Sequence, residues 1–316
     1  MKITEKLKER FCKDCNIPIR IFREPYFEDR ILLYDSQYHT IEKWKTFIKE
    51  LEKYVNEQEY FEDYNRIKDT AINDIKKSDG YNRFINHDMN EFRIKHNDLP
   101  SKDVYKPSNV GERFISIDMK QANFNALKYY SEDIFDNAKT WEEFISKYTD
   151  NKHIINSKYI RQVILGNCCA RRQVTYEKYL MSQVLIYLFD HNIITKDDIE
   201  VFSNDEIVIG VRDNSDKSRD DLSMVIRQFN FPLTIPEYIL CDISGATGYC
   251  QERILDSGSA DIVLKCANTY NLPFILRYLN KQDVTENDKV FMQEGKLAKF
   301  IETPKVEVNL SEAYRI

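Results

Sequence analysis

Apolar residues in the first hundred positions follow a helical period. From 38 to 77, residues such as Ile41 and Trp44 recur at three- and four-residue spacing, which predicts an amphipathic helix pair. Two short apolar runs precede it, PIRIF at 18–22 and RILLY at 30–34, and we interpret them as a strand pair. The next segment, LPSKDVYKPSNVG, contains two prolines and a glycine and predicts a linker, so we expect a boundary near residue 110.

Beyond this boundary, strand patterns alternate with helical ones. In RFISIDM at 113–119, Phe114, Ser116 and Asp118 share one face, which predicts a strand. The same reasoning predicts strands at 202–211 and 231–240, and helices at 124–130, 141–148, 157–165, 174–189 and 220–229. The last segment predicts a helix from 261 to about 280 and a basic, strand-like tail at 295–308.

Two of these strands contain acids. RFISIDM includes Asp118, and FSNDEIVIGV at 202–211 includes Asp205 and Glu206, although ionised carboxylates cost several kcal/mol to desolvate. On neighbouring antiparallel strands, such acids fit a pair of magnesium ions, because hard cations prefer oxygen ligands. The alternative is that Asp205 and Glu206 form a hairpin turn and Asp118 caps a helix.

Composition narrows the class of protein. Of the 316 residues, 42% are hydrophobic and 31% are charged, which predicts a globular protein. No apolar run is long enough for a membrane helix. We therefore expect a cytoplasmic protein, located in the host cytoplasm if it is viral. Seven cysteines without a repeated spacing argue against a disulfide framework, and the lone pair Cys12 and Cys15 is too little for a zinc site. The net charge of −6 argues weakly against nucleic acid as a partner, although local charge can override the total.

The acids stand in a recognisable context. FISIDMKQANFNAL at 114–127 resembles motif A of the family A DNA polymerases, with Asp118 and Gln121 on the family's Asp and Gln. FSNDEIVIGV resembles motif C, a hairpin in the family, with Asp205 and Glu206 in register and Asn204 in place of the family's His. The resemblance implies that Asn204 and Asp205 form the tip of this hairpin. The resemblance covers about 112–249 and includes the helix 170–192 that leads into motif C.

Motif B is less well matched. SKYIRQVILGN at 157–167 resembles a worn motif B helix, in which Arg161 takes the Lys position, Leu165 the aromatic, Gly166 the glycine and Cys169 the tyrosine. The family's sugar-selecting Glu falls at Asn123, which puts the choice between dNTP and rNTP in doubt. The short distance from Arg161 to Asp205 implies reduced fingers.

The resemblance implies a set of roles. It implies that Asp118 and Asp205 bind two Mg²⁺ ions, with Glu206 as a weaker catalytic participant. It implies further contacts with the nucleotide by Lys158, Arg161, Gln121, Asn123 and Phe124, and with template or primer by Gln173, Arg171, Arg172 and Asn204. For the basic residues, a solvated helix face is the plain alternative.

These expectations define a working hypothesis. We expect an α+β fold. Residues 111–249 should form a polymerase palm with a ferredoxin-like antiparallel sheet, helices on one face and reduced fingers. A mostly helical region (1–110), for which a thumb-like role is one alternative, precedes the palm, and a C-terminal extension (250–316) follows it. The expected function is a magnesium-dependent nucleotidyltransferase that acts in DNA replication, in the first place a small template-dependent DNA polymerase that binds primer–template and nucleoside triphosphates. The alternatives are an RNA polymerase, primase or template-independent extender, or a non-catalytic or split polymerase subunit. A partner subunit that supplies fingers or processivity stays open, and we expect no membrane partner.

Overall fold

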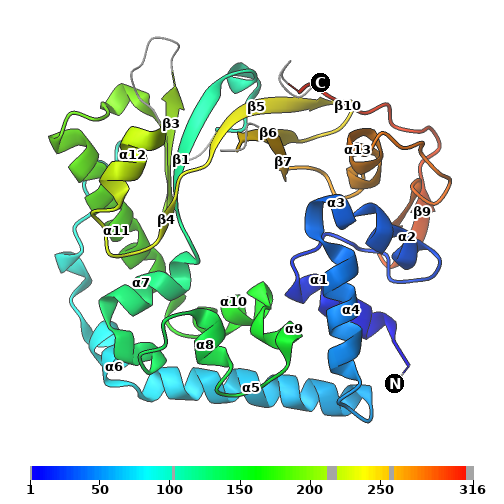
Figure 1. Ribbon diagram of the computed structural model, residues 1–316, viewed down its shortest axis with the longest axis horizontal. Helices are drawn as coiled ribbons and strands as arrows, with labels where there is room; N and C mark the ends of the chain where they lie inside the picture. Colours follow the sequence, from blue (N-terminus) through cyan, green and yellow to red (C-terminus); the bar gives the residue numbers. More distant parts are fainter. Residues whose placement is uncertain (1, 102–103, 212–218, 256–259, 311–316) are drawn as a thin grey trace.

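The computed structural model describes residues 2–101, 104–211, 219–255 and 260–310. The chain has an α+β fold with an antiparallel sheet, as the sequence predicts. In Figure 1 its elements form a ring-like outline, with the sheet at the top, the long helix α5 along the bottom and the N-terminal helices on the right.

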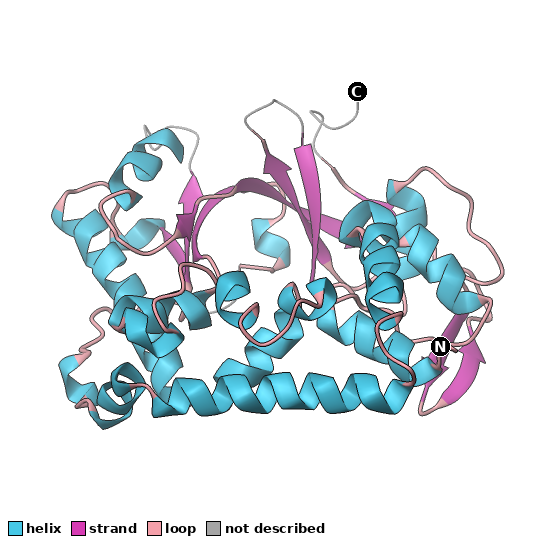
Figure 2. Ribbon diagram, turned by 60° about the horizontal axis from the view of Figure 1, so that its bottom comes forward, coloured by secondary structure: helices cyan, strands magenta, loops and turns pink. Residues whose placement is uncertain are grey.

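The N-terminal region is helical. Its elements are α1 (Glu5–Asp14), α2 (Tyr26–Leu33), α3 (Asp35–Tyr38), α4 (Thr40–Leu51), α5 (Glu57–Lys77) and α6 (Asp79–Asn86). The predicted helix pair at 38–77 is confirmed as α4 and α5. Helix α5 begins where the Asn56 side chain accepts a hydrogen bond from the Glu59 amide at 2.9 Å, and ends with lysines that suit the helix dipole. It connects the N-terminal helices with the opposite side of the molecule (Figures 1 and 2).

The predicted strand pair at 18–22 and 30–34 is wrong. Residues 18–22 form no regular element, and most of the second run belongs to helix α2. Phe27 and Ile31 lie four residues apart and are both buried, which is helical spacing. A short apolar run does not by itself distinguish a strand from a buried helix.

The middle of the chain contains the remaining predicted helices and the short helix α9, which the sequence pattern did not predict. They are α7 (Ala122–Tyr130), α8 (Trp141–Ile145), α9 (Lys152–Ile155), α10 (Lys158–Gly166), α11 (Ala170–Asp190) and α12 (Arg219–Ile226). Short 3₁₀ turns occupy Met89–Glu91, Pro107–Asn109, Glu132–Phe135 and Lys196–Asp198. Helices α7 and α11 pack on each other, and their apolar residues share one core with the sheet positions Ile117 and Ile207. This face of the sheet is therefore covered by helices.

The main sheet has the strand order β2-β3-β1-β5-β6-β7, with β4 paired to β1 and β10 to β5. Its strands are β1 (Arg113–Met119), β2 (Ile199–Phe202), β3 (Glu206–Val211), β4 (Leu233–Thr234), β5 (Glu237–Ser244), β6 (Tyr249–Ile254), β7 (Ala260–Lys265) and β10 (Glu307–Val308). All of its pairings are antiparallel. The sheet continues past residue 249 because β6 and β7 extend it.

The predicted helix from 261 to about 280 is wrong in its first part. Residues Ala260–Lys265 form strand β7, paired along its length with β6, and helix α13 spans only Leu272–Leu279. The predicted basic tail contains β9 (Lys296–Lys299), which forms a hairpin with β8 (Val290–Gln293). Pairing with β6 places the β-branched residues of β7, Ile262 and Val263, in the sheet rather than in a helix.

One hydrophobic core links the N-terminal helices, the central helices and α13. It extends from Leu7 through Ile117 to Leu276. The other face of the sheet carries a smaller core that includes Phe114, Val208 and Tyr238. The linker contributes Val104 to this second core and so covers part of that face.

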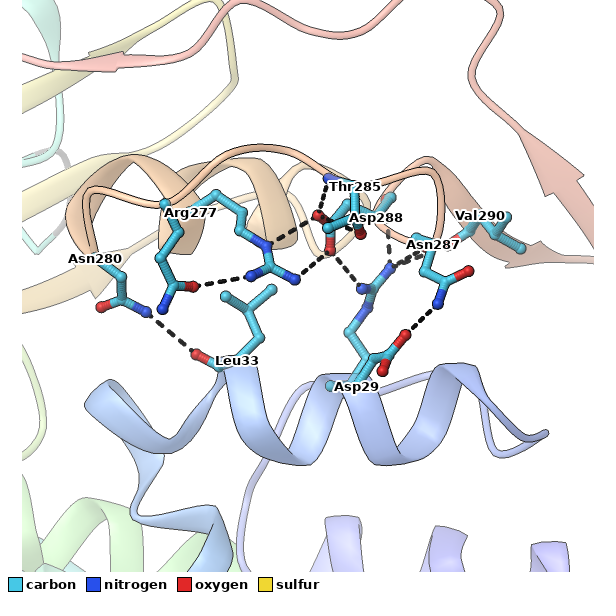
Figure 3. Close-up of polar contacts among 10 residues, drawn as sticks. Asp29, Leu33, Arg277, Asn280, Thr285, Asn287, Asp288 and Val290 are labelled. Carbon is cyan, nitrogen blue, oxygen red and sulfur yellow. Dashed lines mark hydrogen bonds and ion pairs between the residues drawn. The ribbon is translucent and has the colours of Figure 1, made fainter.

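A polar cluster around the buried pair Arg30 and Asp288 joins the N-terminal and C-terminal parts of the chain. We call it the Asp288 cluster, and it consists of Arg30, Arg277, Thr285 and Asp288; Figure 3 labels the last three. Asp288 Oδ1 accepts a hydrogen bond from Arg30 Nη1 at 3.0 Å, and Asp288 Oδ2 accepts from Arg277 Nε and the Thr285 amide. Arg30 Nη2 also donates to the Val290 carbonyl at the start of β8. The C-terminal segment is therefore fastened to helix α2.

We predict that Asp288→Ala lowers the free energy of unfolding by roughly 3–5 kcal/mol, because the buried guanidinium of Arg30 loses its carboxylate. Arg30 is only 3% exposed. Urea denaturation followed by circular dichroism measures the change. The control is Asp150→Ala, which removes an exposed partner of Lys53 and should change little. Equal midpoints for the two variants would contradict the structural role of the cluster.

Candidate active site

A tight hairpin between β2 and β3 positions the acids of the predicted motif C. The segment 202–211 is not one continuous strand but the predicted hairpin with Asn204 and Asp205 at its tip, because β2 ends at Phe202 and β3 begins at Glu206. The Ser203 amide donates to the Glu206 carbonyl at 2.9 Å, and the Ser203 hydroxyl accepts from the Glu206 amide. Asn204 and Asp205 therefore lie in the turn, where Asn204 is exposed.

The strand β1 brings Asp118 to this turn. Strands β1 and β3 are antiparallel neighbours, and Asp118 pairs with Glu206 in their register. The Met119 amide donates to the Asp205 carbonyl at 2.8 Å. Directly opposed residues on such strands have Cα atoms about 4.5–5.5 Å apart. The prediction that Asp118 and Asp205 lie on neighbouring strands of one antiparallel sheet is confirmed in this form, with Asp205 one residue before β3.

Burial and charge crowding act on Asp118. Burial, then the carboxylates of Glu206 and Asp205, raise the pKa of Asp118 to about 6, against the opposing effect of Lys265 and Arg253. Glu206 is itself oriented, because its Oε1 accepts a hydrogen bond from the Ser116 hydroxyl at 2.6 Å. A carboxylate in this position would be stabilised by a cation.

A cavity of about 420 Å³, which we call the site cavity, borders Asp118 and Asp205. Its lining includes most of the predicted nucleotide ligands and one predicted template ligand: Gln121, Asn123, Lys158, Arg161 and Gln173. These residues come from α7 and its N-cap, α10 and α11, so the fold brings the cations Lys158 and Arg161 to the same space as Asp118 and Asp205.

Helix α10 presents the cations of the site cavity. Its N-terminus is capped by Ser157, whose hydroxyl accepts from the Ile160 amide, and its C-terminus is held by the Gln173 amide, which donates to the Leu165 carbonyl at 2.7 Å. Gln173 is thus buried and bonded to backbone. Its predicted template contact stays a prediction.

Arg161 and Lys158 face the cavity without a partner of opposite charge. Neither makes an ion pair with the residues that the structure describes, and the buried Arg161 Nε has no hydrogen-bond acceptor among them. Burial lowers the pKa of Arg161, and the carboxylate of Glu142 opposes this shift. A half-buried guanidinium with an unused donor suits an anionic ligand.

Some predicted ligands lie elsewhere. Phe124 belongs to the core, because its ring is 1% exposed and packs on Phe135 at 4.5 Å, so the proposed nucleotide contact is wrong for this side chain. Arg172 donates to the Phe84 and His87 carbonyls at the end of α6, and Arg171 is exposed. Neither arginine lines the site cavity, and their predicted template contacts stay predictions.

A second cavity of about 460 Å³ lies on the other side of Asp118, over the open face of the sheet. We call it the sheet-face cavity. Its lining includes Ser116 and Glu206 together with the cations Arg253 of β6 and Lys265 of β7. Burial lowers the pKa of Lys265, while Glu206 and Asp118 act in the opposite direction. The sequence pattern did not identify these two cations, because it assigned residue 265 to a helix and residue 253 to no element.

Glu177 of α11 is a further acid that the sequence analysis missed. It lines the site cavity, is 7% exposed and makes no hydrogen bond or ion pair with the described part of the chain. Burial, followed by Asp205, raises its pKa to about 7. The signal was available, since Glu177 occupies a buried helical position between Gln173 and Leu180.

The donors present fit magnesium only in part. Within the described residues, no group of three or more His, Cys, Asp or Glu side chains is arranged to hold a metal ion. Mg²⁺ often takes only one or two protein carboxylates and completes its shell with water and substrate phosphates. Two crowded carboxylates beside a cavity match that donor set, and the raised pKa of Asp118 reflects a charge that a divalent cation would relieve.

Comparisons with protein-family models, with curated proteins and with solved structures found no match to this chain. The resemblance to family A polymerases therefore rests on the motifs alone. Among the described helices, none has the length and apolar character needed to cross a membrane.

We predict that Asp118→Asn stabilises the metal-free protein at pH 8. A carboxyl with a raised pKa holds more protons when folded than when unfolded. Stability therefore falls as pH rises from about 4, the unfolded pKa, to about 6, the folded value. After allowance for solvent screening, removal of this charge raises the free energy of unfolding by on the order of 1 kcal/mol, which raises the melting temperature by about 2 °C.

Thermal melts at pH 8 and pH 4.5 check this prediction. The gain should shrink at pH 4.5, and Mg²⁺ should stabilise the wild type more than the variant. Asp150→Asn, at a 90% exposed side chain, is the matched control. Equal melting temperatures for the wild type and Asp118→Asn at pH 8 would show that the charge of Asp118 does not destabilise the folded protein.

Proposed function

We propose that this chain is a nucleotidyltransferase that extends a nucleic-acid 3′ end from nucleoside triphosphates. One observation carries the proposal: Asp118 and Asp205, from neighbouring strands, and Lys158 and Arg161, from one face of α10, border the same cavity. Carboxylates for divalent metal ions and cations for phosphates are the two ingredients of phosphoryl transfer.

In this proposal Asp118 and Asp205 hold two Mg²⁺ ions. When bound, such ions supply Lewis-acid stabilisation of the attacking and leaving oxygens. Glu206 keeps the carboxylate edge in place through its hydrogen bond with Ser116 and acts as a weaker participant.

Arg161 and Lys158 bind the triphosphate in this proposal. The unused Nε–H of Arg161 is available to donate to a phosphate oxygen. As negative charge develops on the departing pyrophosphate, both cations stabilise it more strongly. Gln121 and Asn123 also line the site cavity, and in this proposal they contact the sugar or base.

Within this class, a small template-dependent DNA polymerase is the leading proposal. It is supported by the order and content of the three motifs and by the open, charged face of the sheet beside Asp118. Asn123 is the sugar-selecting position and Phe124 is turned into the core, which favours weak discrimination between dNTP and rNTP. The alternatives are an RNA polymerase, primase or template-independent extender, and a non-catalytic or split subunit.

We predict that Asp118→Asn and Asp205→Asn each reduce primer extension by about 10³-fold, because loss of a metal-binding carboxylate removes roughly 4 kcal/mol of transition-state stabilisation. The assay combines the purified chain, a labelled primer with and without template, Mg²⁺, and either dNTPs or rNTPs. Asp150→Asn should retain wild-type activity.

The arms of this assay separate the alternatives. Extension without template indicates a template-independent extender, and extension with rNTPs alone indicates an RNA polymerase or primase. Primer–template binding with no extension by the wild type in any arm would reject the catalytic proposal and favour a binding subunit.

We further predict that Arg161→Ala raises KM for the nucleotide about tenfold or more, because a charge-assisted hydrogen bond is worth about 1.5–3 kcal/mol. Arg161→Lys should recover part of the loss, since it restores charge without the planar donors. Steady-state kinetics give the split between KM and kcat. The control is Lys147→Ala, whose amine pairs with Asp136 away from the cavity. Unchanged kinetics in Arg161→Ala would remove this residue from the nucleotide site.

A further inference from the structure

Another cavity lies apart from the acids of the proposed active site. It has a volume of about 940 Å³, and we call it the central cavity. Its walls come from α1, the extended segment 16–22, α10, β7 and the β8–β9 hairpin. Figure 1 shows α1, α10 and β7 around the middle of the molecule. Neither the predicted motifs nor the proposed reaction uses it.

Aromatic rings line the central cavity from several directions. They are Phe22, Tyr38 of α3, Tyr159 of α10 and Tyr270, which precedes α13. Tyr270 is 38% exposed, and the other three are partly exposed. Arg10 lies over the Tyr159 ring at 4.9 Å. Rings spread over separate elements offer successive stacking surfaces, whereas a single small ligand calls for polar groups that converge on one point.

The charges of the central cavity favour an anion. Lys13 is paired with Glu9 at 2.6 Å, so these two side chains offset each other. Arg20 is exposed and makes no hydrogen bond or ion pair with any described residue. One unpaired guanidinium among partly exposed aromatic rings is the pattern of a single-strand nucleic-acid surface.

The central cavity and the proposed active site share two elements, α10 and β7. On α10, Tyr159 faces the central cavity while its neighbours Lys158 and Arg161 line the site cavity. On β7, Leu264 faces the central cavity while Lys265 lines the sheet-face cavity. A strand held in the central cavity therefore contacts the same two elements, α10 and β7, that border the cavities at Asp118.

The Asp288 cluster holds the β8–β9 hairpin, which forms one wall of the central cavity. Arg30 bonds to the Val290 carbonyl at the start of β8, and Met292 and Gly295 of this hairpin line the central cavity (Figure 3). The closure between the two ends of the chain therefore builds most of the cavity wall, to which the segment 112–249 contributes Tyr159.

We propose that the central cavity binds a single-stranded segment of nucleic acid, namely the template strand that leads to the site at Asp118. This inference rests on the proposed function for the identity of the strand. Binding by itself requires only the aromatic rings and Arg20, so it can be measured without catalysis.

The test is fluorescence anisotropy of the full chain with a labelled oligodeoxythymidine of roughly 12 nucleotides, without nucleoside triphosphates. Arg20→Glu should weaken binding about tenfold and lower the slope of log affinity against log salt by about 1. Arg23→Glu is the matched control, because Arg23 lies three residues away, pairs with Glu5 and does not line the cavity. It should leave affinity and slope close to those of the wild type.

Tyr159 gives an independent arm. Tyr159→Ala should weaken binding about tenfold, because base stacking is lost, whereas Tyr159→Phe keeps the ring and should bind like the wild type. Circular dichroism checks that each variant is folded. If Tyr159→Ala does not fold, the result rests on Arg20→Glu, because the Arg20 side chain is exposed.

The outcomes separate this inference from the proposed function. Weaker binding in Arg20→Glu, together with normal binding in Asp118→Asn, supports the central cavity even if no extension is found. Wild-type affinity and salt slope in Arg20→Glu and Tyr159→Ala overturn it even if the chain is a polymerase. Displacement of the oligonucleotide by an equal concentration of a mononucleotide also overturns it, since the cavity would then be a nucleotide site.

Discussion

Antiparallel pairing between β1 and β3 is the constraint on which the site depends. The pairing sets Asp118 opposite Glu206, and the bond from the Met119 amide to the Asp205 carbonyl fixes the hairpin turn beside it. A shift of one residue in this register would turn Asp118 toward the helical core. The buried isoleucines on the opposite face prevent that shift, because it would expose them to the sheet-face cavity. Core packing therefore holds the charged edge in position.

Nearby cations offset the negative charge of Asp118 and Glu206 only in part. Asp118 and Glu206 lie within electrostatic range of Arg253 and Lys265 on the sheet, while Lys158 and Arg161 occupy the opposite cavity. Burial and carboxylate crowding keep the pKa of Asp118 near 6 despite the two cations on the sheet. Crowded, partly buried carboxylates of this kind lower the stability of the fold, and such perturbed groups are common at functional sites.

The closure between the chain ends is a separate structural element. The Asp288 cluster fastens the C-terminal segment to α2, and α5 connects the N-terminal helices with the central ones (Figures 1 and 3). Together they make the N- and C-terminal segments walls of the central cavity. These segments, which the motif resemblance does not reach, gain a defined place beside the proposed active site.

The sequence by itself determined the local features: the strand that ends near Asp118, the hairpin acids Asp205 and Glu206, and the helices α4, α5, α7, α10 and α11. Periodicity and turn residues encode these because they depend on neighbours in the chain. It did not distinguish helix α2 from a strand, since that short apolar run fits both, nor did it identify β7. Only the tertiary structure decided that Lys265, Arg253 and Glu177 border the acids, that Phe124 is core, and that Arg30 meets Asp288. These contacts join residues far apart in sequence, and their register is fixed by packing of the whole chain rather than by any local pattern.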